Sequence, residues 1–82
     1  MRMKFTINTM EYNNLTLYYI GNSNRVITLF DIAEKIKISV EELREILYKH
    51  GSSTSYYFKT KEEIENAIEE LESIYILNQF TT

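Results

Sequence analysis

The chain has 82 residues, of which 44% are hydrophobic and 26% are charged, and its net charge is −3 at neutral pH. These values are typical of one small globular domain and exclude a disordered or fibrous chain. The chain also holds no cysteine, one histidine (His50) and two widely separated glycines, which excludes thiolate and multi-histidine metal sites, cysteine nucleophiles and glycine-rich phosphate loops. We therefore expect a protein that is not an enzyme and uses no cofactor or metal.

An antiparallel hairpin or small sheet is expected at the beginning of the chain. Its first segment alternates polar and apolar residues with period two, as a half-buried strand does, and a second strand follows the turn residues Asn13 and Asn14. A stronger turn signal comes at residues 21–24, because glycine and asparagine tolerate positive φ. It predicts a short third strand. The three strands are expected at residues 4–10, 15–20 and 25–27.

Three helices are expected after this region, and each begins with the same capping pattern. A serine or threonine precedes the helix and an acidic residue follows three positions later, so that the hydroxyl accepts a hydrogen bond from a free backbone N–H and the carboxylate accepts one in return. Aspartate is a weaker partner than glutamate in this pattern, so the first pair is expected to be the least secure. The pairs are Thr28 with Asp31, Ser39 with Glu42, and Thr60 with Glu63.

The ends of these helices are also marked in the sequence. The helices are expected over residues 29–36, 40–49 and 61–78. Gly51 predicts a left-handed cap after the second helix, and His50 beside it is expected to complement the negative end of that helix. After a polar loop, the aromatic segment Tyr56–Phe58 predicts a short strand.

The third helix carries two sets of large apolar residues. One set follows a single stripe at helical spacing, which predicts the face buried in the core. This set is Ile64, Ala67, Ile68, Leu71, Ile74 and Tyr75. The other set, Ile76, Leu77 and Phe80, misses the stripe, and an exposed apolar group of this kind predicts the interface of a homodimer. The alternative is that the helix ends early and residues 74–77 fold back as an edge strand.

Residues 29–47 resemble the helix-turn-helix of DNA-binding regulators. That motif needs a small residue where its helices cross, apolar neighbours around it, an apolar turn residue before a capping hydroxyl, and apolar positions in the second helix. The residues that meet these needs are Ile32, Ala33, Ile36, Ile38, Ser39, Leu43 and Ile46. The sequence departs from the motif at Lys37, where glycine is usual, and a left-handed residue there costs about 1 kcal/mol.

The aromatic segment and the third helix resemble the wing and trailing helix of the excisionase and mercury-regulator group of winged-helix proteins, so the resemblance covers residues 28–71. It implies an α+β, winged-helix-like single domain with a short wing strand and a long C-terminal amphipathic helix. The expected regions are a β-hairpin region at 1–27, a helix-turn-helix at 28–51, a wing at 52–59, and a C-terminal helix and tail at 60–82. The resemblance further implies a small bacterial, phage or plasmid regulator, or accessory factor, that binds duplex DNA as a homodimer.

In such a fold the second helix enters the major groove of double-stranded DNA and its first residues approach the bases. Arg44 and Ser39 are then expected nearest the bases, and three lysines are expected on phosphates. A basic patch around the second helix and the wing is expected to complete this surface. One tyrosine is expected to add a ring that stacks or a hydroxyl that hydrogen-bonds to phosphate. The residues expected to contact DNA are Lys37, Ser39, Val40, Arg44, Lys49, Tyr57, Lys59 and Lys61.

The distribution of acidic residues supports a different hypothesis. Residues 61–72 hold one lysine and six glutamates, a net charge of −5, and Glu41 and Glu45 lie on the second helix. Phosphates repel these side chains. The packing positions of the helix-turn-helix are also filled by apolar residues in any compact helical hairpin, so the pattern does not by itself require DNA binding. The alternative function is therefore a protein-binding module, such as a small phage-type antagonist of a host or defence protein, that uses its acidic helix or its hairpin.

The expected location of the protein follows from the absence of long apolar segments. No stretch of the sequence approaches the roughly 20 apolar residues that a membrane span requires. The first eight residues are basic but lack the apolar run of a signal peptide. We therefore expect a cytoplasmic protein with no membrane association and no small-molecule substrate.

Overall fold

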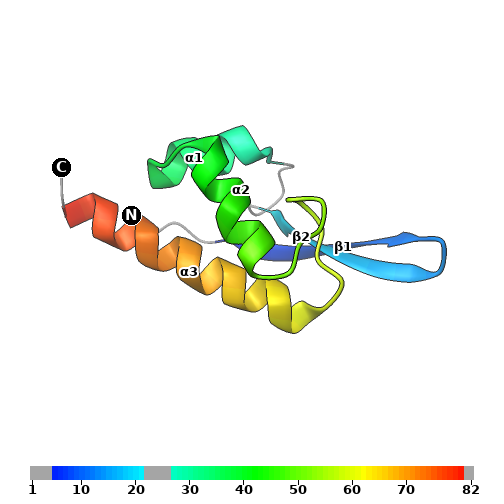
Figure 1. Ribbon diagram of the computed structural model, residues 1–82. Helices are drawn as coiled ribbons and strands as arrows, with labels where there is room; N and C mark the ends of the chain where they lie inside the picture. The colour runs from blue at the N-terminus through cyan, green and yellow to red at the C-terminus, as the bar shows by residue number, and fades with distance from the viewer. Residues whose placement is uncertain (1–4, 22–26, 81–82) are drawn as a thin grey trace.

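The computed structural model describes residues 5–21 and 27–80. Its elements, in chain order, are β1 (Thr6–Tyr12), β2 (Leu15–Gly21), α1 (Leu29–Ile36), α2 (Val40–Lys49) and α3 (Lys61–Phe80). The fold is α+β, with a two-stranded antiparallel hairpin followed by three helices, of which the last is long (Figure 1). The predicted fold class is confirmed.

The hairpin turns at Asn13 and Asn14, as predicted. Their φ angles are 50° and 65°, and a two-residue turn that matches the twist of its strands needs positive φ at both positions. Tyr12 and Leu15 face each other on either side of the turn. The strand before the turn runs two residues further along the chain than the alternation predicts, because pairing continues to the turn itself. The predicted third strand lies mostly outside the described residues, and Ile27, which is described, is buried outside any strand.

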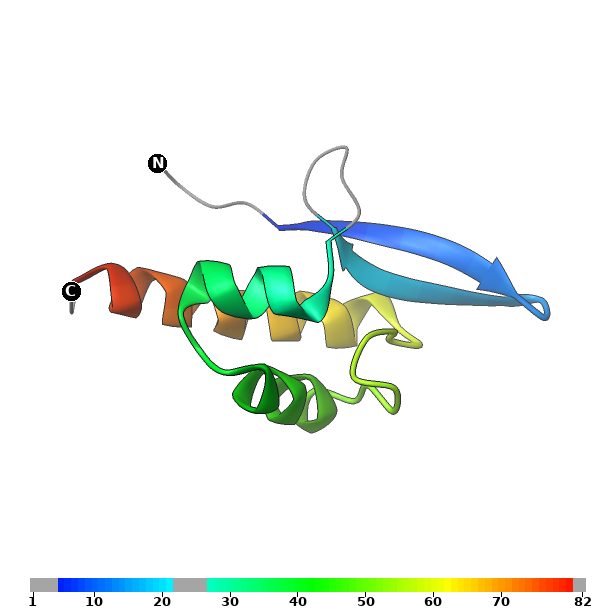
Figure 2. The same cartoon turned by 90° about the horizontal axis from the view of Figure 1, so that it is seen from above.

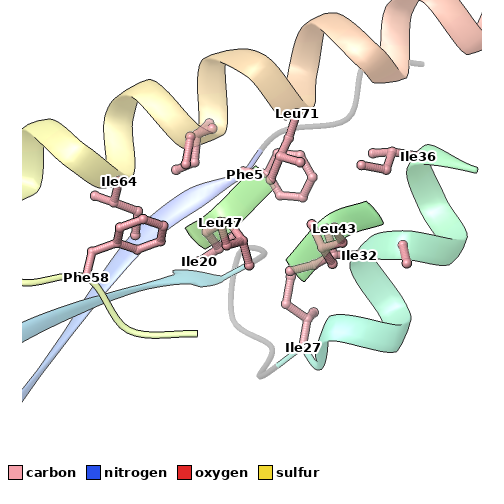
Figure 3. Packing of buried hydrophobic residues seen from close by; sticks show 13 residues of the cluster. Phe5, Ile20, Ile27, Ile32, Ile36, Leu43, Leu47, Phe58, Ile64 and Leu71 are labelled. Carbon is pink, nitrogen blue, oxygen red and sulfur yellow. The ribbon is translucent and has the colours of Figure 1, made fainter. Parts of the chain in front are cut away.

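One face of the hairpin and the three helices enclose a single core. The hairpin contributes Phe5 and Ile20, and Phe58 enters from the segment before α3 with no exposed surface. Figure 3 shows Phe58 and Ile64 at one end of this cluster and the side chains of α1 at the other. The predicted stripe of α3 is buried from Ile64 to Leu71 and half-buried at Ile74 and Tyr75. Burial of a large aliphatic or aromatic side chain contributes about 1.5–3 kcal/mol, so this cluster is the main source of stability.

All three predicted N-caps are formed. The Asp31 N–H donates to Thr28 Oγ1 at 3.2 Å and the Thr28 N–H donates to Asp31 Oδ2 at 3.0 Å, so the pair expected to be the least secure is complete. In the other two caps the hydroxyl accepts from the backbone N–H three residues on, at 3.1 Å for Ser39 and 3.2 Å for Thr60. These local bonds explain why the helix starts are predictable from the sequence.

The predicted cap at Gly51 is also formed. Gly51 has a φ of 111°, and its N–H donates to the Tyr48 carbonyl oxygen at 3.0 Å. The next N–H, of Ser52, reaches back to the Leu47 carbonyl oxygen at 3.0 Å. This pair of bonds is a Schellman motif, in which a left-handed residue satisfies the last free carbonyls of a helix.

The end of α1 depends on a residue from the far end of the chain. Lys37 caps the helix in the left-handed conformation, with a φ of 62°. The Asn78 side-chain amide then donates to the Ile36 carbonyl oxygen at 2.6 Å. Figure 2 shows the end of α1 beside the last turns of α3, where Asn78 lies. The last turns of α3 therefore cap α1.

The predicted aromatic strand at residues 56–58 is wrong except at one residue. Only Phe58 pairs with the sheet, through two backbone bonds to Tyr18 of 2.9 and 2.8 Å. The N–H groups of Tyr56 and Tyr57 both donate to Thr54 Oγ1, at 3.2 and 2.8 Å. A local side-chain acceptor competes with strand pairing in this way, and the expected wing strand shrinks to a single bridge.

The left-handed Lys37 yields a stability prediction. Replacement of Lys37 by glycine removes the strain of a side chain at positive φ, so we expect Lys37→Gly to raise the free energy of unfolding by about 0.5–1 kcal/mol. Urea denaturation measures the change. The matched control is Lys35→Gly inside α1, which we expect to lower stability by about 1 kcal/mol. Equal losses in the two variants would show that Lys37 is not left-handed in solution.

Candidate functional site

The residues expected to read DNA lie on the surface of the α1–α2 pair, but among acids. Ser39, Lys37 and Arg44 are exposed, whereas Val40 is half-buried. The other charged residues exposed on α2 are Glu41, Glu42, Glu45 and Lys49. Three carboxylates therefore share this helix with the single guanidinium, and each of them repels a phosphate backbone.

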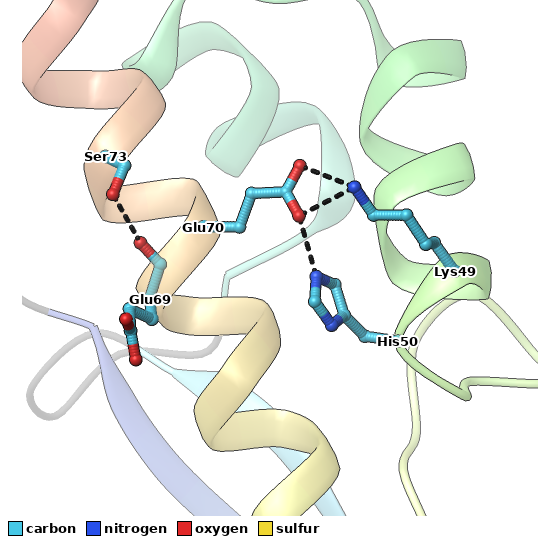
Figure 4. A network of polar contacts seen from close by, with 5 residues as sticks. All are labelled: Lys49, His50, Glu69, Glu70 and Ser73. Carbon is cyan, nitrogen blue, oxygen red and sulfur yellow. Dashed lines mark hydrogen bonds and ion pairs between the residues drawn. The ribbon is translucent and has the colours of Figure 1, made fainter.

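Lys49 forms an ion pair with α3, and its side chain remains 60% exposed. Its Nζ lies 2.8 and 2.9 Å from the two carboxylate oxygens of Glu70, and the His50 Nε2 lies 2.7 Å from Glu70 Oε1 (Figure 4). An ionised carboxylate only accepts hydrogen bonds, so Nε2 donates. The His50 side chain thus binds α3, a contact that its position beside a helix end did not predict. Hydrogen bonds from Lys49 and then from His50 lower the pKa of the Glu70 carboxyl below its usual 4.5.

The predicted basic patch is divided between two sides of α3. Lys61 is exposed on the flank of α3 that faces β1, next to Glu65 and away from the flank where Glu70 holds Lys49. Lys59 is exposed in the segment before the helix. The structure therefore does not bring Lys49 and Lys61 together on one surface.

Tyr57 packs inside a cluster of three tyrosines. Its ring lies edge-on to those of Tyr56 and Tyr19, with centroid distances of 4.8 and 5.7 Å, and the last two rings stack at 5.6 Å. Burial, with smaller effects of its two neighbours, raises the pKa of the Tyr56 hydroxyl. The cluster ties the loop before α3 to β2, so the Tyr57 ring is already partly covered by protein.

The residues expected at a dimer interface are exposed together on the last turns of α3. The exposed fractions are 47% for Ile76, 63% for Leu77 and 82% for Phe80. The helix continues to Phe80, so the alternative edge strand at residues 74–77 is wrong. Fold-back is unnecessary because Ile74 and Tyr75 pack against the core while the helix continues.

Sequence reasoning missed an open groove between β1 and α3. Its volume is about 910 Å³, and its floor combines the apolar or aromatic side chains of Phe5, Ile7, Tyr18 and Ile68 with two threonines, Thr6 and Thr9. Its α3 side carries three glutamates and one lysine, which are Glu65, Glu69, Glu72 and Lys61. Helix α3 packs against β2 and leaves the face of β1 that points toward α3 partly uncovered. The sequence signals of this groove, alternating apolar residues and a run of glutamates, are the same as those of an ordinary core and a solvated face.

The hairpin also projects beyond the helices, as both views show (Figures 1 and 2). Tyr12 and Leu15 at its tip are each 60% exposed. Neither residue packs against the core cluster. The tip is therefore a second exposed apolar surface, separate from the end of α3.

Comparisons with protein-family models, with curated proteins and with solved structures find no match for this chain. Within the described residues, no three His, Cys, Asp or Glu side chains come together to hold a metal ion. None of the helices in residues 27–80 has the length and apolar character that crossing a membrane requires.

The lowered pKa of Glu70 yields a prediction about acid stability. A carboxyl group with a lowered pKa in the folded state stabilises the fold above its ordinary pKa, and this contribution is lost as pH falls through the lowered value. We expect Glu70→Gln to destabilise the protein by about 0.5–1 kcal/mol near pH 7, and by less near pH 3. Urea denaturation at both pH values measures the difference.

The matched control for this experiment is Glu65→Gln, at an exposed position of α3 beyond its first turn and outside the Lys49–Glu70–His50 contacts. We expect it to leave stability unchanged at neutral pH. A loss from Glu70→Gln that is the same at both pH values would contradict the ionic contribution of Glu70.

Proposed function

We propose that this protein is a protein-binding domain that holds a basic segment of its partner in the groove between β1 and α3. The observation that carries the proposal is the composition of that groove, with a largely apolar floor and an acidic side. Specific interfaces commonly combine an apolar centre with a polar rim in this way. The acidic side of the groove selects a positively charged partner, and the floor buries apolar surface of that partner.

The charges along the groove are available to a partner. Glu65 and Glu69 are exposed and Glu72 is half-buried, and none of the three takes part in an ion pair within the described part of the chain. Lys61 is the single cation among the residues that line the groove. A lysine or arginine of a partner therefore meets a net negative surface, which steers association and weakens with salt.

Charge reversal in the groove tests this proposal. We expect Glu65→Lys with Glu69→Lys to reduce the affinity for short peptides rich in lysine and arginine by about tenfold or more, because attraction becomes repulsion. Fluorescence anisotropy with labelled peptides measures affinity, and ¹⁵N NMR maps the contacts to β1 and α3.

The matched control is Glu41→Lys with Glu45→Lys, which changes the net charge equally at the same helical spacing but lies on α2. This control separates a local effect from that of overall charge. If both double variants weaken peptide binding alike, the groove is not the site. If no basic peptide binds the wild-type protein at low salt, the proposed function is wrong.

Duplex DNA is a second candidate partner, and the packing of α1 against α2 favours it. Ala33 is buried with no more than 3% of its surface exposed, and the turn runs through a left-handed Lys37 to the capping Ser39. These are the features of a helix-turn-helix, and Arg44 lies on the exposed side of its second helix. In this second candidate the exposed end of α3 joins two copies, so that two α2 helices reach successive half-sites.

The DNA candidate predicts that Arg44→Ala weakens binding to duplex fragments by about 1–3 kcal/mol and relaxes one base preference. Binding to mixed genomic fragments at about 50 and 200 mM salt measures affinity and its dependence on phosphate contacts. Lys59→Ala is the comparison, because loss of a phosphate contact lowers affinity uniformly across sequences. Unchanged affinity in both variants would exclude this surface, and absence of binding at the lower salt concentration would exclude the candidate.

A further inference from the structure

The hydrogen bonds of Tyr18 show which way the backbone of β1 points. The Tyr18 N–H and C=O both bond to Phe58, at 2.9 and 2.8 Å, on the outer edge of β2. Thr9 is the partner of Tyr18 in the register of the hairpin. Because Tyr18 turns both groups away from Thr9, this is a non-hydrogen-bonded pair, and the N–H and C=O of Thr9 point to the outer edge of β1.

The same alternation places two more residues on this edge. In an antiparallel pair every second residue directs its backbone outward, so Ile7 and Glu11 share the orientation of Thr9. The sheet contains only β1 and β2 among the described residues, and within them no backbone group bonds to the outer edge of β1. A row of free donors and acceptors of this kind is a template for another strand.

This free edge borders the groove. Ile7 and Thr9 line the groove from the side of β1, and Figure 2 shows β1 on the side of the hairpin away from α1 and α2. A strand added to the edge would extend the sheet over the uncovered flank of α3. The side chains of the added strand that point toward α3 would then lie over Ile68 and the three glutamates of that flank.

We propose that the partner binds as an extended strand, added antiparallel to the outer edge of β1, with basic side chains at alternate positions directed to Glu65, Glu69 and Glu72. This inference rests on the proposed function and specifies how the groove is used. Backbone bonds to Ile7, Thr9 and Glu11 supply affinity, and the acidic row selects the side chains.

The spacing of the charges agrees with a strand. Side chains on one face of a strand repeat about every 6.6–6.8 Å, and residues four apart on a helix are separated by about 6 Å along its axis. Glu65 and Glu69 are four apart, and both views show α3 and β1 running along similar directions (Figures 1 and 2). Two successive basic side chains of one strand can therefore each reach a glutamate.

A second copy of this chain does not fit the same edge as well. The residues of β1 include one acid, Glu11, and no lysine or arginine. Paired β1 strands would therefore bring acidic and neutral side chains to the glutamates of α3. The charge of the groove favours a different, basic partner strand.

The test uses seven-residue peptides, the length of β1, with lysine or arginine at alternate positions and threonine or valine between them. In an antiparallel addition, the peptide residues opposite Ile7, Thr9 and Glu11 donate their backbone N–H groups to β1. Their side chains lie on the same face of the sheet as the side chains of these three residues, so the basic residues of the peptide are the ones whose N–H groups donate. We expect N-methylation of the basic residues to weaken binding about tenfold or more, and N-methylation of the intervening residues to change it less than about twofold.

A protein variant provides an independent test. Thr9→Pro removes the central donor of the free edge, and proline is tolerated on strand edges. Thr16→Pro is the control, because Thr16, the register partner of Glu11, likewise directs its N–H outward, but to the opposite edge of the hairpin. We expect only Thr9→Pro to weaken peptide binding. Amide hydrogen exchange at Ile7, Thr9 and Glu11 should slow when the peptide binds the wild-type protein.

The outcomes separate this inference from the proposed function. If the peptides bind and the charge reversal at Glu65 and Glu69 abolishes binding, but both N-methylated sets bind alike, strand addition is wrong and the basic-segment groove remains. Unchanged hydrogen exchange at the β1 edge in the bound state also overturns strand addition. If none of these peptides binds the wild-type protein, both the strand and the groove are wrong.

Discussion

The packing of α3 across the molecule is the interaction on which the other elements depend. A two-stranded hairpin is marginal by itself in water, and a helix as short as α1 does not persist alone. The buried stripe of α3, from Ile64 to Leu71, lies against both and completes one core. Its end also caps α1 through Asn78. The fold is therefore organised around one amphipathic helix with unlike neighbours on its two flanks.

Glutamates on the two flanks of α3 have two different roles. On the side of α2, Glu70 accepts hydrogen bonds from Lys49 and His50 and holds two helices together. On the side of β1, Glu65 and Glu69 face an open groove with a largely apolar floor. This contrast arises because α2 brings cations to its flank, whereas β1 brings an uncovered strand. The acidic run is thus structural on one side and available to a partner on the other.

Much of the fold was predictable because short-range interactions determine it. The caps at Thr28, Ser39 and Thr60 bond within three residues, and Gly51 closes α2 through its own turn. The hairpin turn at residues 13–14 requires only asparagines that accept positive φ. The predicted bounds of α1 and α2 agree with the structure, while α3 runs two residues further, to the exposed Phe80.

The sequence by itself determined where the three helices begin, where α1 and α2 end, and which stripe of α3 is buried, since capping and helical periodicity act over a few residues. Only the tertiary structure decided which charges are neutralised, that the expected wing strand is a single bridge at Phe58, and that β1 keeps a free edge above an acidic flank. These features depend on how the hairpin and α2 pack on opposite sides of α3. Contacts between residues distant in the chain, such as Lys49 with Glu70, leave no periodic or local signal in the sequence.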